Sequence, residues 1–410
     1  MIPLLRPGSL QALPPLSLYI HLPWCLRKCP YCDFNSHEVR RVGMNGDTAK
    51  VAANGVAGML DAATEQRYLA ALVADLESAL PQIWGRRIHT IFFGGGTPSL
   101  FSPEGIDRLL ADVRARVVLE HDCEITLEAN PGTFERDRFK AFRQAGVNRL
   151  SIGVQTFDDA RLKTLGRVHS GDQARAAIEE AARCFDTFNI DLMYALPGQT
   201  PDDLQRDLDT ALAFQPPHLS LYHLTMEPNT VFGNQPPAGL PDDDTAFDML
   251  DQLVAATAAA GLQRYEVSAY ARPGHRCLHN LNYWQFGDYL GIGAGAHSKL
   301  SFPDRIVRQT RWREPASYMD MAEQGQPCSN ETPVALKDRP FEFMMNALRL
   351  REGFELARYT ERTGLSLASI QAPLAEAEAK GLLQRDLHRA WPTDKGFDFL
   401  SDLQGLFLQG

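Results

Sequence analysis

Short apolar runs alternate with longer amphipathic stretches along most of this 410-residue chain, and this alternation limits the possible folds more than any other feature. Six runs have the length and residue types of β-strands and lie at residues 17–21, 88–93, 124–128, 149–154, 187–192 and 218–223. The stretches that separate and follow them predict helices at residues 66–80, 103–119, 136–145, 171–184, 201–213 and 244–260. Strands that alternate with helices in this way form a parallel sheet with helical crossovers.

The predicted sheet belongs to the α/β class. Its strands are almost continuously apolar, as expected for strands that are covered on both faces. A closed barrel of eight strand–helix units takes about 250 residues, whereas the alternating region here spans residues 15–300 and supplies six units. We therefore expect a partial (β/α)6 barrel related to the TIM barrel, with an open doubly wound sheet as the alternative.

Three segments lie outside this alternation. Residues 1–14 form an N-terminal tail, and residues 42–63, which are rich in Gly, Ala and Asn, predict a mobile insertion. The alternation stops in residues 301–410. Two predicted helices and a short hairpin within residues 337–391 are typical of a small helical domain of the winged-helix kind.

Composition argues against some classes of function. The chain has 41 Lys and Arg against 51 Asp and Glu, a net charge of −10, so nucleic acid is not the expected partner. It has no run of about 20 apolar residues, and residues 1–15 are too short and too rich in proline for a secretory signal. The expected compartment is the reducing cytosol, and association with the membrane surface is left open.

Seven cysteines are present, and three of them lie within eight residues, in Cys25-Leu-Arg-Lys-Cys29-Pro-Tyr-Cys32. Without a secretion signal, such clustering indicates metal or redox ligands rather than disulfides. Three thiolates on one loop can hold three corners of a [4Fe–4S] cluster, which usually takes four protein thiolates. One iron would then stay open to a substrate or cofactor. A structural zinc site with His21 or His37 as the fourth ligand is the alternative.

Polar residues recur at the predicted carboxyl ends of the strands. They are His21, the glycines after Phe93, Glu128, Gln155, Asp191 and His223. In barrels of this class the carboxyl ends meet on one face, where catalytic groups gather. Each residue alone is more often structural, but together they predict a shared site.

The segment Tyr19-Ile-His-Leu-Pro-Trp-Cys25, followed by the C-x3-C-x2-C spacing, resembles the motif of radical S-adenosylmethionine (SAM) proteins. More narrowly, the chain is similar to the group of that family that holds oxygen-independent coproporphyrinogen III oxidase and heme chaperones. The resemblance extends from Tyr19 to about Ser301 and, less closely, into the C-terminal region. It implies the partial barrel, with a [4Fe–4S] cluster on Cys25, Cys29 and Cys32.

The resemblance also implies a SAM site beside the cluster. The segment Phe93-Gly-Gly-Gly-Thr-Pro98 matches the part of the family that lies along the amino and carboxylate groups of SAM. The positions that match SAM contacts are Tyr19, Tyr31, Gly95, Gly96, Thr97, Glu128, Gln155, Arg167 and Asp191. A buried carboxylate such as Glu128 needs a cationic or hydrogen-bonding partner, and Arg167 could pair with the methionyl carboxylate. Cluster and SAM together imply one-electron chemistry in a barrel that excludes water.

Two differences from the oxidase favour the heme chaperones. The oxidase carries a further Cys two positions after the third ligand, where this chain has Phe34, and its N-terminal extension is longer. In addition, the pattern HNxxYW, which is associated with heme binding in the heme chaperones, occurs here from residue 279 to 284. The residues implied in heme binding are His279, Asn280, Tyr283, Trp284 and Cys277. Without the resemblance, a buried and hydrogen-bonded His in an aromatic core is the simpler interpretation.

The resemblance therefore implies a heme chaperone that binds a [4Fe–4S] cluster, SAM and heme and passes heme to apo-hemoproteins such as respiratory cytochromes. An electron donor such as a flavodoxin or ferredoxin is a further expected partner. Oxidative decarboxylation of coproporphyrinogen III to protoporphyrinogen IX is the alternative, although Phe34 argues against it. A scaffold with structural zinc is the third interpretation. No residue is assigned a catalytic role.

Overall fold

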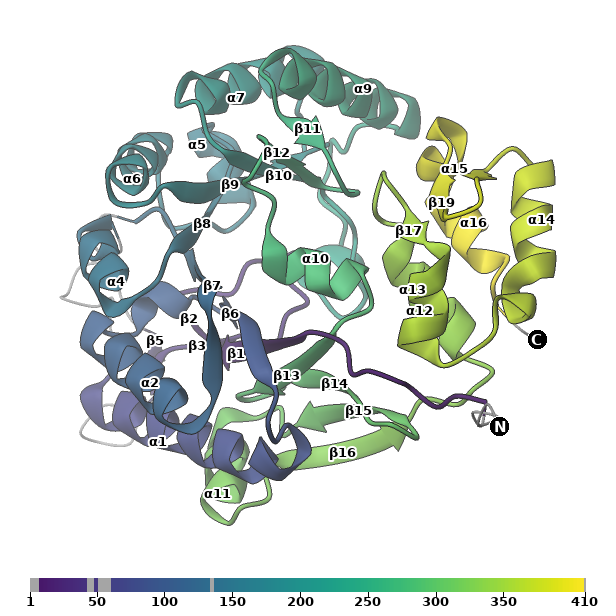
Figure 1. The fold of residues 1–410 in the computed structure, drawn as a ribbon. Helices are drawn as coiled ribbons and strands as arrows, with labels where there is room; N and C mark the ends of the chain where they lie inside the picture. The colour runs from purple at the N-terminus through teal and green to yellow at the C-terminus, as the bar shows by residue number, and fades with distance from the viewer. Residues whose placement is uncertain (1–6, 43–47, 51–59, 133–135, 409–410) are drawn as a thin grey trace.

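The computed structural model describes residues 7–42, 48–50, 60–132 and 136–408, and its main feature is a twelve-stranded mixed sheet (Figure 1). In spatial order the strands are β11 (Gln263–Arg264), β12 (Ala269–Ala271), β10 (His218–His223), β9 (Thr187–Tyr194), β8 (Arg149–Gln155), β7 (Val118–Ala129), β6 (Arg87–Gly95), β1 (Leu16–Leu22), β13 (Asp288–Ile292), β14 (His297–Ser301), β15 (Ile306–Arg311) and β16 (Cys328–Pro333). The strands from β10 to β13 in this order are parallel to their neighbours.

Helices surround the parallel strands on the outside, as Figure 1 shows. The outer helices are α1 (Ala62–Ala79), α2 (Pro103–Arg116), α4 (Phe139–Ala145), α6 (Gly171–Cys184), α7 (Pro201–Ala213) and α9 (Asp243–Ala259). The six strands β1 and β6 to β10 are spatial neighbours in chain order. Successive right-handed crossovers then place every helix on the same face, which produces a partial barrel. The expected (β/α)6 architecture is confirmed, because these strands lack the reversal of order that defines a doubly wound sheet.

Short elements connect this framework. They are β2 (Trp24–Cys25), β3 (His37–Glu38), β4 (Arg40–Val42), β5 (Thr48–Lys50), α5 (Asp159–Thr164), α8 (Val231–Asn234), α10 (Leu278–Trp284), α11 (Pro315–Glu323) and the 3₁₀ turns Leu80–Gln82 and Pro98–Leu100. Most of the expected mobile insertion at 42–63 lies outside the described residues, although β4 pairs with β5 in antiparallel fashion.

Local sequence explains where several elements begin and end. A capping box starts α6, in which Ser170 and Gln173 each hydrogen-bond to the other's backbone, and α7 begins in the same way. The helix expected at 103–119 ends earlier, at Arg116. The adjacent valines, including Val118, favour extended backbone, so β7 begins there and is longer than the sequence predicts.

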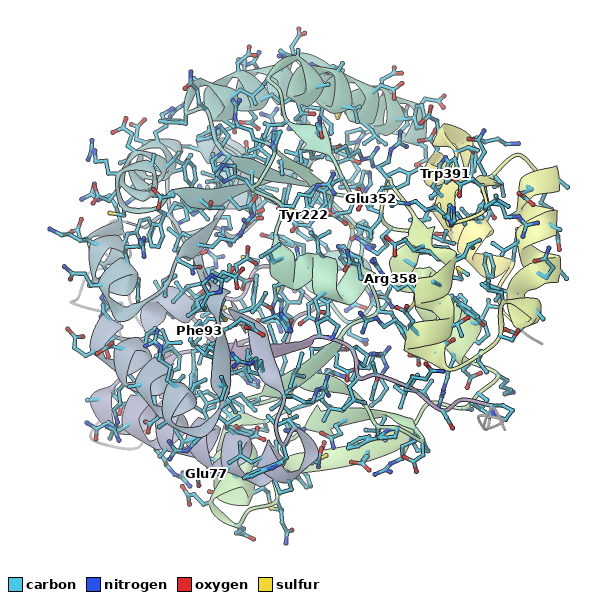
Figure 2. The ribbon with its side chains drawn as sticks, viewed as in Figure 1. Glu77, Phe93, Tyr222, Glu352, Arg358 and Trp391 are labelled. Carbon is cyan, nitrogen blue, oxygen red and sulfur yellow. The ribbon has the colours of Figure 1, made fainter. Side chains whose placement is uncertain are left out.

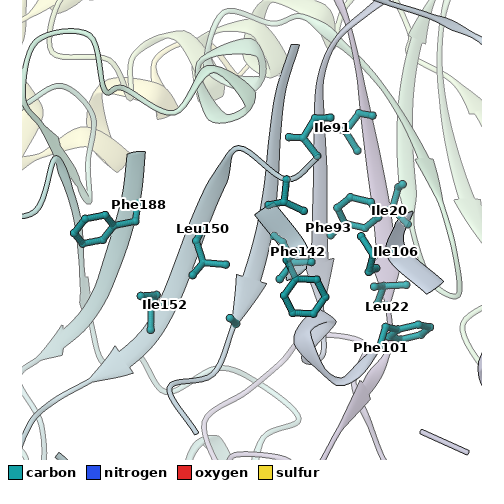
Figure 3. Close-up of a cluster of buried hydrophobic side chains, with 14 of the residues drawn as sticks. Ile20, Leu22, Ile91, Phe93, Phe101, Ile106, Phe142, Leu150, Ile152 and Phe188 are labelled. Carbon is teal, nitrogen blue, oxygen red and sulfur yellow. The ribbon is translucent and has the colours of Figure 1, made fainter. Parts of the chain in front are cut away.

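The main core lies between the sheet and the outer helices. Ile20 on β1, Phe93 on β6 and Leu150 on β8 are fully buried and pack with helix residues such as Ile106 and Phe142 (Figure 3). Removing this apolar surface from water contributes roughly 25 cal/mol per Å² to folding. The core therefore fixes the strands whose carboxyl ends carry the site.

The sheet continues past residue 300, where the sequence suggests a domain boundary. Antiparallel pairing joins β14 to β15 and β15 to β16, so the sheet ends at Pro333. A second core follows it, built mainly from α12 (Arg339–Ala347), α13 (Leu356–Thr363), the 3₁₀ turn Leu367–Ile370, α14 (Gln371–Ala379), α15 (Asp394–Asp398), α16 (Leu400–Gly405) and a small sheet of β17 (Phe354–Glu355), β18 (Leu383–Arg385) and β19 (Arg389–Pro392). The hairpin predicted at 381–391 is β18 and β19.

Residues 7–14, the described part of the N-terminal tail, contact this C-terminal region. Leu10 is 6% exposed and belongs to the second core. The Gly8 N–H donates to the Gly364 carbonyl at 2.9 Å, and the Arg339 guanidinium donates to the Gly8 carbonyl at 2.8 Å. The start of the chain is thus attached to its last hundred residues before it enters β1.

Candidate functional site

A cavity of about 330 Å³, which we call the thiol cavity, lies at the carboxyl ends of the parallel strands. Its walls contain the clustered cysteines and most of the positions that match SAM contacts. These are Cys25, Cys29, Cys32, Tyr31, Gly95, Gly96, Thr97, Glu128, Gln155, Arg167 and Asp191. Figure 2 shows another wall residue, Tyr222, inside the ring of helices, whereas Glu77 on α1 lies near the outer edge. The structure thus brings side chains from distant parts of the sequence into one space.

The three cysteines lie on a loop that is held in place at its ends and in its middle. β2 pairs with β3, which joins the two ends of the loop. Within the loop, the Cys32 N–H donates to the Cys29 carbonyl at 3.1 Å, and the Pro30 carbonyl accepts from the Phe232 N–H of α8 at 3.0 Å. This bracing presents all three thiols to the same cavity.

Burial keeps two of these thiols protonated in the ligand-free protein. It raises the pKa of Cys25 to about 11, although the Thr97 hydroxyl donates to the sulfur at 3.6 Å, and it also raises the pKa of Cys32. Metal binding must displace these protons. The cavity therefore fits a centre that binds thiolates strongly, such as an iron–sulfur cluster.

The geometry does not favour the zinc alternative. Among the residues that the structure describes, no three Cys, His, Asp or Glu side chains are arranged to hold a single metal ion. Of the two candidate fourth ligands, His21 uses both ring nitrogens, in hydrogen bonds with the Tyr19 hydroxyl at 2.9 Å and the Asn35 carbonyl at 2.8 Å. The Nε2 of His37 is buried without a partner in the described residues, but it does not form such a group with the cysteines. A cluster places iron and sulfide between its thiolates, so it suits cysteines that are spaced around a cavity.

The glycine-rich segment after β6 packs directly against the cysteine loop. The Gly96 N–H donates to the Leu22 carbonyl and the Thr97 N–H to the Trp24 carbonyl, both at 2.8 Å. A Cβ on Gly96 would lie 2.5 Å from the Trp24 oxygen, and Gly95 has a φ of +117°, so both positions require glycine. The amide N–H of Gly95 is also donated within the protein. The segment would therefore meet an ammonium group through carbonyl oxygens.

Two half-buried carboxyl groups face the cavity without a direct ion pair, although the charge of Arg167 acts on Asp191. Glu128 accepts from the Gly95 N–H at 3.2 Å, and burial and the neighbouring Asp191 raise the pKa of Glu128 to about 8. Asp191 accepts from Asn189 at 2.7 Å and from Ser151 at 3.1 Å, and burial raises its pKa to about 6. Neither forms an ion pair with a described Lys or Arg. Such carboxyls suit a ligand that carries positive charge, as the sulfonium and ammonium groups of SAM do.

Arg167 supplies a positive charge to the same cavity. Its Nη2 donates to the Asn130 side chain at 2.5 Å and to the Gly153 carbonyl at 2.7 Å, and its Nη1 lies 3.8 Å from the Cys29 sulfur. Its Nε is buried and has no acceptor in the described part of the chain. A guanidinium held by two protein acceptors, with one N–H unused, fits a ligand carboxylate.

Gln155 is placed by an irregular strand end. It ends β8 with a φ of +71°, where the register between β8 and β9 shifts. A residue other than glycine adopts this conformation only when its surroundings impose it, and such positions gather at functional sites. The shift directs the side chain of Gln155 into the cavity wall.

Sequence reasoning missed some residues of this cavity. Asn130 joins two expected residues, since it donates to the Thr97 hydroxyl at 3.0 Å and accepts from Arg167. It follows Glu128 at the end of β7, so the strand-end argument could have found it. On β10 the cavity takes Tyr222 and not the expected His223, because successive strand residues point to opposite faces.

A second cavity of about 770 Å³, which we call the β14 cavity, shares a wall with the first. Phe34, Gly95 and Glu128 line both cavities. Tyr19, which the resemblance places near SAM, lines the β14 cavity and not the thiol cavity. Its phenol ring stacks on Phe92 with ring centres 6.3 Å apart. Phe92 lines the thiol cavity, so Tyr19 lies one ring behind its wall.

The residues implied in heme binding are divided between the two cavities. Cys277 and Asn280 line the thiol cavity, whereas Tyr283 and Trp284 line the β14 cavity. The Cys277 thiol is 3% exposed, and burial raises its pKa to about 12. The structure does not bring these four residues to one surface.

His279 lines neither cavity. It is 1% exposed, its Nδ1 hydrogen-bonds with the Thr90 hydroxyl at 2.7 Å, and its Nε2 hydrogen-bonds with the Tyr283 hydroxyl at 2.9 Å. Burial lowers the pKa of His279 to about 3, so the ring is neutral. Since both ring nitrogens are engaged, His279 has no free lone pair for iron in this conformation.

Two family models match the chain. The model of the radical SAM superfamily covers residues 19–211, and the model of the HemN C-terminal domain covers residues 334–399. The heme chaperone HemW of Escherichia coli strain K12 is 47% identical over 398 residues, which are 97% of this chain and 99% of that protein. This chain belongs to the HemW family. Family members from Mycobacterium tuberculosis H37Rv and Bacillus subtilis strain 168 are 36% and 32% identical and cover 93% and 96% of the chain.

A solved structure shares the fold. Coproporphyrinogen III oxidase (HemN) from Escherichia coli, described as a radical SAM enzyme, superimposes with a TM-score of 0.78 at 24% identity and covers 97% of this chain and 91% of its own. The C-terminal family match begins at residue 334, directly after β16. Membership of the radical SAM superfamily implies a [4Fe–4S] cluster and SAM. In the described ranges, no helix is long and apolar enough to cross a membrane.

Proposed function

We propose that this protein is a heme chaperone that holds a [4Fe–4S] cluster on Cys25, Cys29 and Cys32, binds SAM beside it and delivers heme to apo-hemoproteins such as respiratory cytochromes. The observation that carries the proposal is the 47% identity to a heme chaperone over nearly the whole chain. The thiol cavity supports the cluster and SAM independently, because it contains the residue types that each requires.

The charges of the thiol cavity suggest how SAM would lie in it. Glu128 and Asp191 would face its cationic groups, and the unused N–H of Arg167 would hold its carboxylate. When bound and reduced, the cluster supplies one electron to SAM. The protein's part is to orient the ligand and to exclude water.

A flavodoxin or ferredoxin is the electron donor that we propose. Arg27 and Lys28 are exposed on the cysteine loop, between the first two cysteines. Exposed cations beside a redox centre attract an acidic carrier and speed its association. This local charge contrasts with the net charge of −10 of the whole chain.

Anaerobic reconstitution tests the proposed function. We expect about four irons per chain, binding of SAM, a change in the Soret band when hemin is titrated, and transfer of heme to an apo-cytochrome. Cys328→Ser, which removes an exposed cysteine on β16, should behave like the wild type in all these measurements. A protein that shows no Soret change and transfers no heme would contradict the proposal. A vinyl product from coproporphyrinogen III under reducing conditions with SAM would support the oxidase instead.

A further inference from the structure

The β14 cavity contains a histidine with an unused ring nitrogen. His297 is exposed at the start of β14, and its Nδ1 lies 3.4 Å from the Thr310 hydroxyl. Its Nε2 has no hydrogen-bond partner in the described residues. Partial desolvation of its ring and the charges of Arg308 and Arg313 lower its pKa, which favours the neutral imidazole that can donate a lone pair to a metal. The other histidine of this cavity, His21, uses both nitrogens.

Aromatic rings form one side of the cavity. Tyr283 and Tyr289 meet edge to face with ring centres 4.6 Å apart, and Trp284 is the next ring along α10. Apolar side chains at two wall positions are open to solvent, since Phe34 is 63% exposed and Met345 is 40% exposed. These surfaces suit a large planar apolar ligand.

Two donors in the cavity walls lack acceptors. The Arg313 side chain is exposed and forms no ion pair with any described residue, unlike Arg308, which donates to Glu342 at 2.7 Å and to Tyr289 at 2.8 Å. The indole N–H of Trp284 is buried and has no acceptor in the described residues. Unused donors beside an apolar surface suit a ligand that is apolar in its plane and carries carboxylates.

We propose that the heme of the proposed function binds in the β14 cavity, with Nε2 of His297 on the iron and the heme carboxylates held by Arg313 and the Trp284 N–H. The volume of about 770 Å³ lies within the range of roughly 300–1,000 Å³ of small-molecule sites. His279 is then a positioning residue, since its hydrogen bond holds the Tyr283 ring that lines the cavity. This assignment rests on the proposed function.

The first test compares three histidine variants of the full-length, reconstituted protein by hemin titration. We expect His297→Ala to weaken hemin binding at least ten-fold and to shift the Soret maximum and the electron paramagnetic resonance spectrum of ferric heme. His279→Ala should keep the ferric heme spectrum of the wild type and weaken binding less. His121→Ala, which changes a side chain that is 93% exposed, should leave both unchanged.

These outcomes separate the assignment from the proposed function. If the wild type binds hemin and His297→Ala has the wild-type spectrum and affinity, the assignment is wrong while the proposed function stands. If the wild type binds no hemin, both fail. Because His297 is exposed, its variant should unfold at the wild-type temperature.

The second test concerns the carboxylates. Arg313→Ala should weaken hemin binding roughly ten-fold but leave the affinity for hemin dimethyl ester unchanged, because the ester has no carboxylate charge. Arg305→Ala, which removes another exposed arginine, is the control. Equal losses for hemin and for its ester would overturn the role of Arg313.

Discussion

The thiol cavity and the β14 cavity share a wall but differ in charge. Glu128 lies on the shared wall. The first cavity adds Asp191, which forms no ion pair with a described Lys or Arg, whereas the second adds Arg313 and the Trp284 N–H, which have no described acceptor. A cavity with unmatched carboxyls favours a cation, and one with unmatched donors favours an anion. Because the two cavities carry different unmatched groups, a cationic and an anionic ligand can each have a preferred cavity although the cavities are adjacent.

The two cavities are also built differently. Parallel strands of the barrel supply most of the thiol cavity, at their carboxyl ends. The β14 cavity takes walls from the antiparallel strands β14 and β15 and from Met345 and Asn346 of α12. The C-terminal region therefore contributes to the second cavity and not to the first, and under our proposal for heme it would form part of the heme site.

Replacing Cys25, Cys29 and Cys32 together by Ser should produce the largest separation of the two cavities. Serine hydroxyls are poor ligands for iron, so the variant should lose all cluster iron and, with it, SAM binding. Hemin affinity should stay within about two-fold of the wild type, because the iron ligand that we propose lies in the other cavity. Iron analysis and the two titrations measure this.

Cys328→Ser is the control for that experiment. It should retain iron, SAM and hemin binding, since the thiol is exposed and far along the sequence from the loop. Loss of hemin binding in the triple variant, with SAM binding preserved, would reverse the assignment of the two ligands to the two cavities.

Asp191→Asn should weaken SAM binding by roughly ten- to one hundred-fold, because it removes a buried charge that we expect to face a cation. Hemin affinity should not change. Isothermal titration with SAM on the reconstituted protein provides the measurement, and Asp244→Asn, an exposed acid on α9, is the matched control. Unchanged SAM affinity in Asp191→Asn would mean that the carboxyl serves the fold alone.

The contrast between the cavities also shows what a single sequence can predict. The expected helices at 171–184 and 201–213 coincide with α6 and α7 because both have clear caps and apolar periodicity. The thiol cavity follows from the same signals, since its residues lie in short motifs directly after apolar strands. Position along a strand is thus enough to place Glu128 or Asp191 near the cysteines.

The β14 cavity has a weaker signal, because Tyr19, Tyr283 and Trp284 lie in motifs but the other residues that we assign to heme do not. Its wall residues Asn35, His297 and Met345 come from three distant segments. The strand β16, at the sheet edge, is exposed throughout, so it lacks the apolar run that marks the other strands. His279 lies in a recognisable motif, but its partner Thr90 is 189 residues away, and the motif does not reveal that bond. Contacts of this kind appear only when the chain is folded.

The pH dependence of SAM binding should reveal the two carboxyls. The cation binds their ionised forms, and the pKa of Glu128 is about 8 and that of Asp191 about 6 in the ligand-free protein. SAM affinity should therefore rise roughly forty-fold between pH 6 and 7.5, before the amino group of SAM loses its own proton near pH 8. Glu128→Gln should flatten the upper part of this rise, and a flat wild-type profile would contradict it.

As the pH rises and SAM affinity increases, the stability of the ligand-free protein should decrease. The folded-state pKa of Glu128 lies above its ordinary value of 4.5, so the stabilisation from its neutral form is present below pH 4.5 and lost as the pH rises through 8. The contribution of this residue therefore lowers the unfolding temperature between pH 6 and 8.5. Glu128→Gln should remove that contribution, as calorimetry of both proteins would show.

Phe34→Ala should have the smallest effect on ligand binding, and it tests whether the shared wall couples the two cavities. Phe34 lines both cavities and is 63% exposed, so removing its ring costs little stability. A ligand in one cavity should order the Phe34 side chain and so change the affinity of the other cavity for its ligand. We therefore expect SAM to change hemin affinity by two- to three-fold in the wild type and not in Phe34→Ala. Leu387→Ala, which truncates a side chain that is 90% exposed, is the control. If SAM alters hemin affinity equally in the wild type and in Phe34→Ala, the coupling does not pass through Phe34, and Glu128 and Gly95, which also line both cavities, are the next residues to replace.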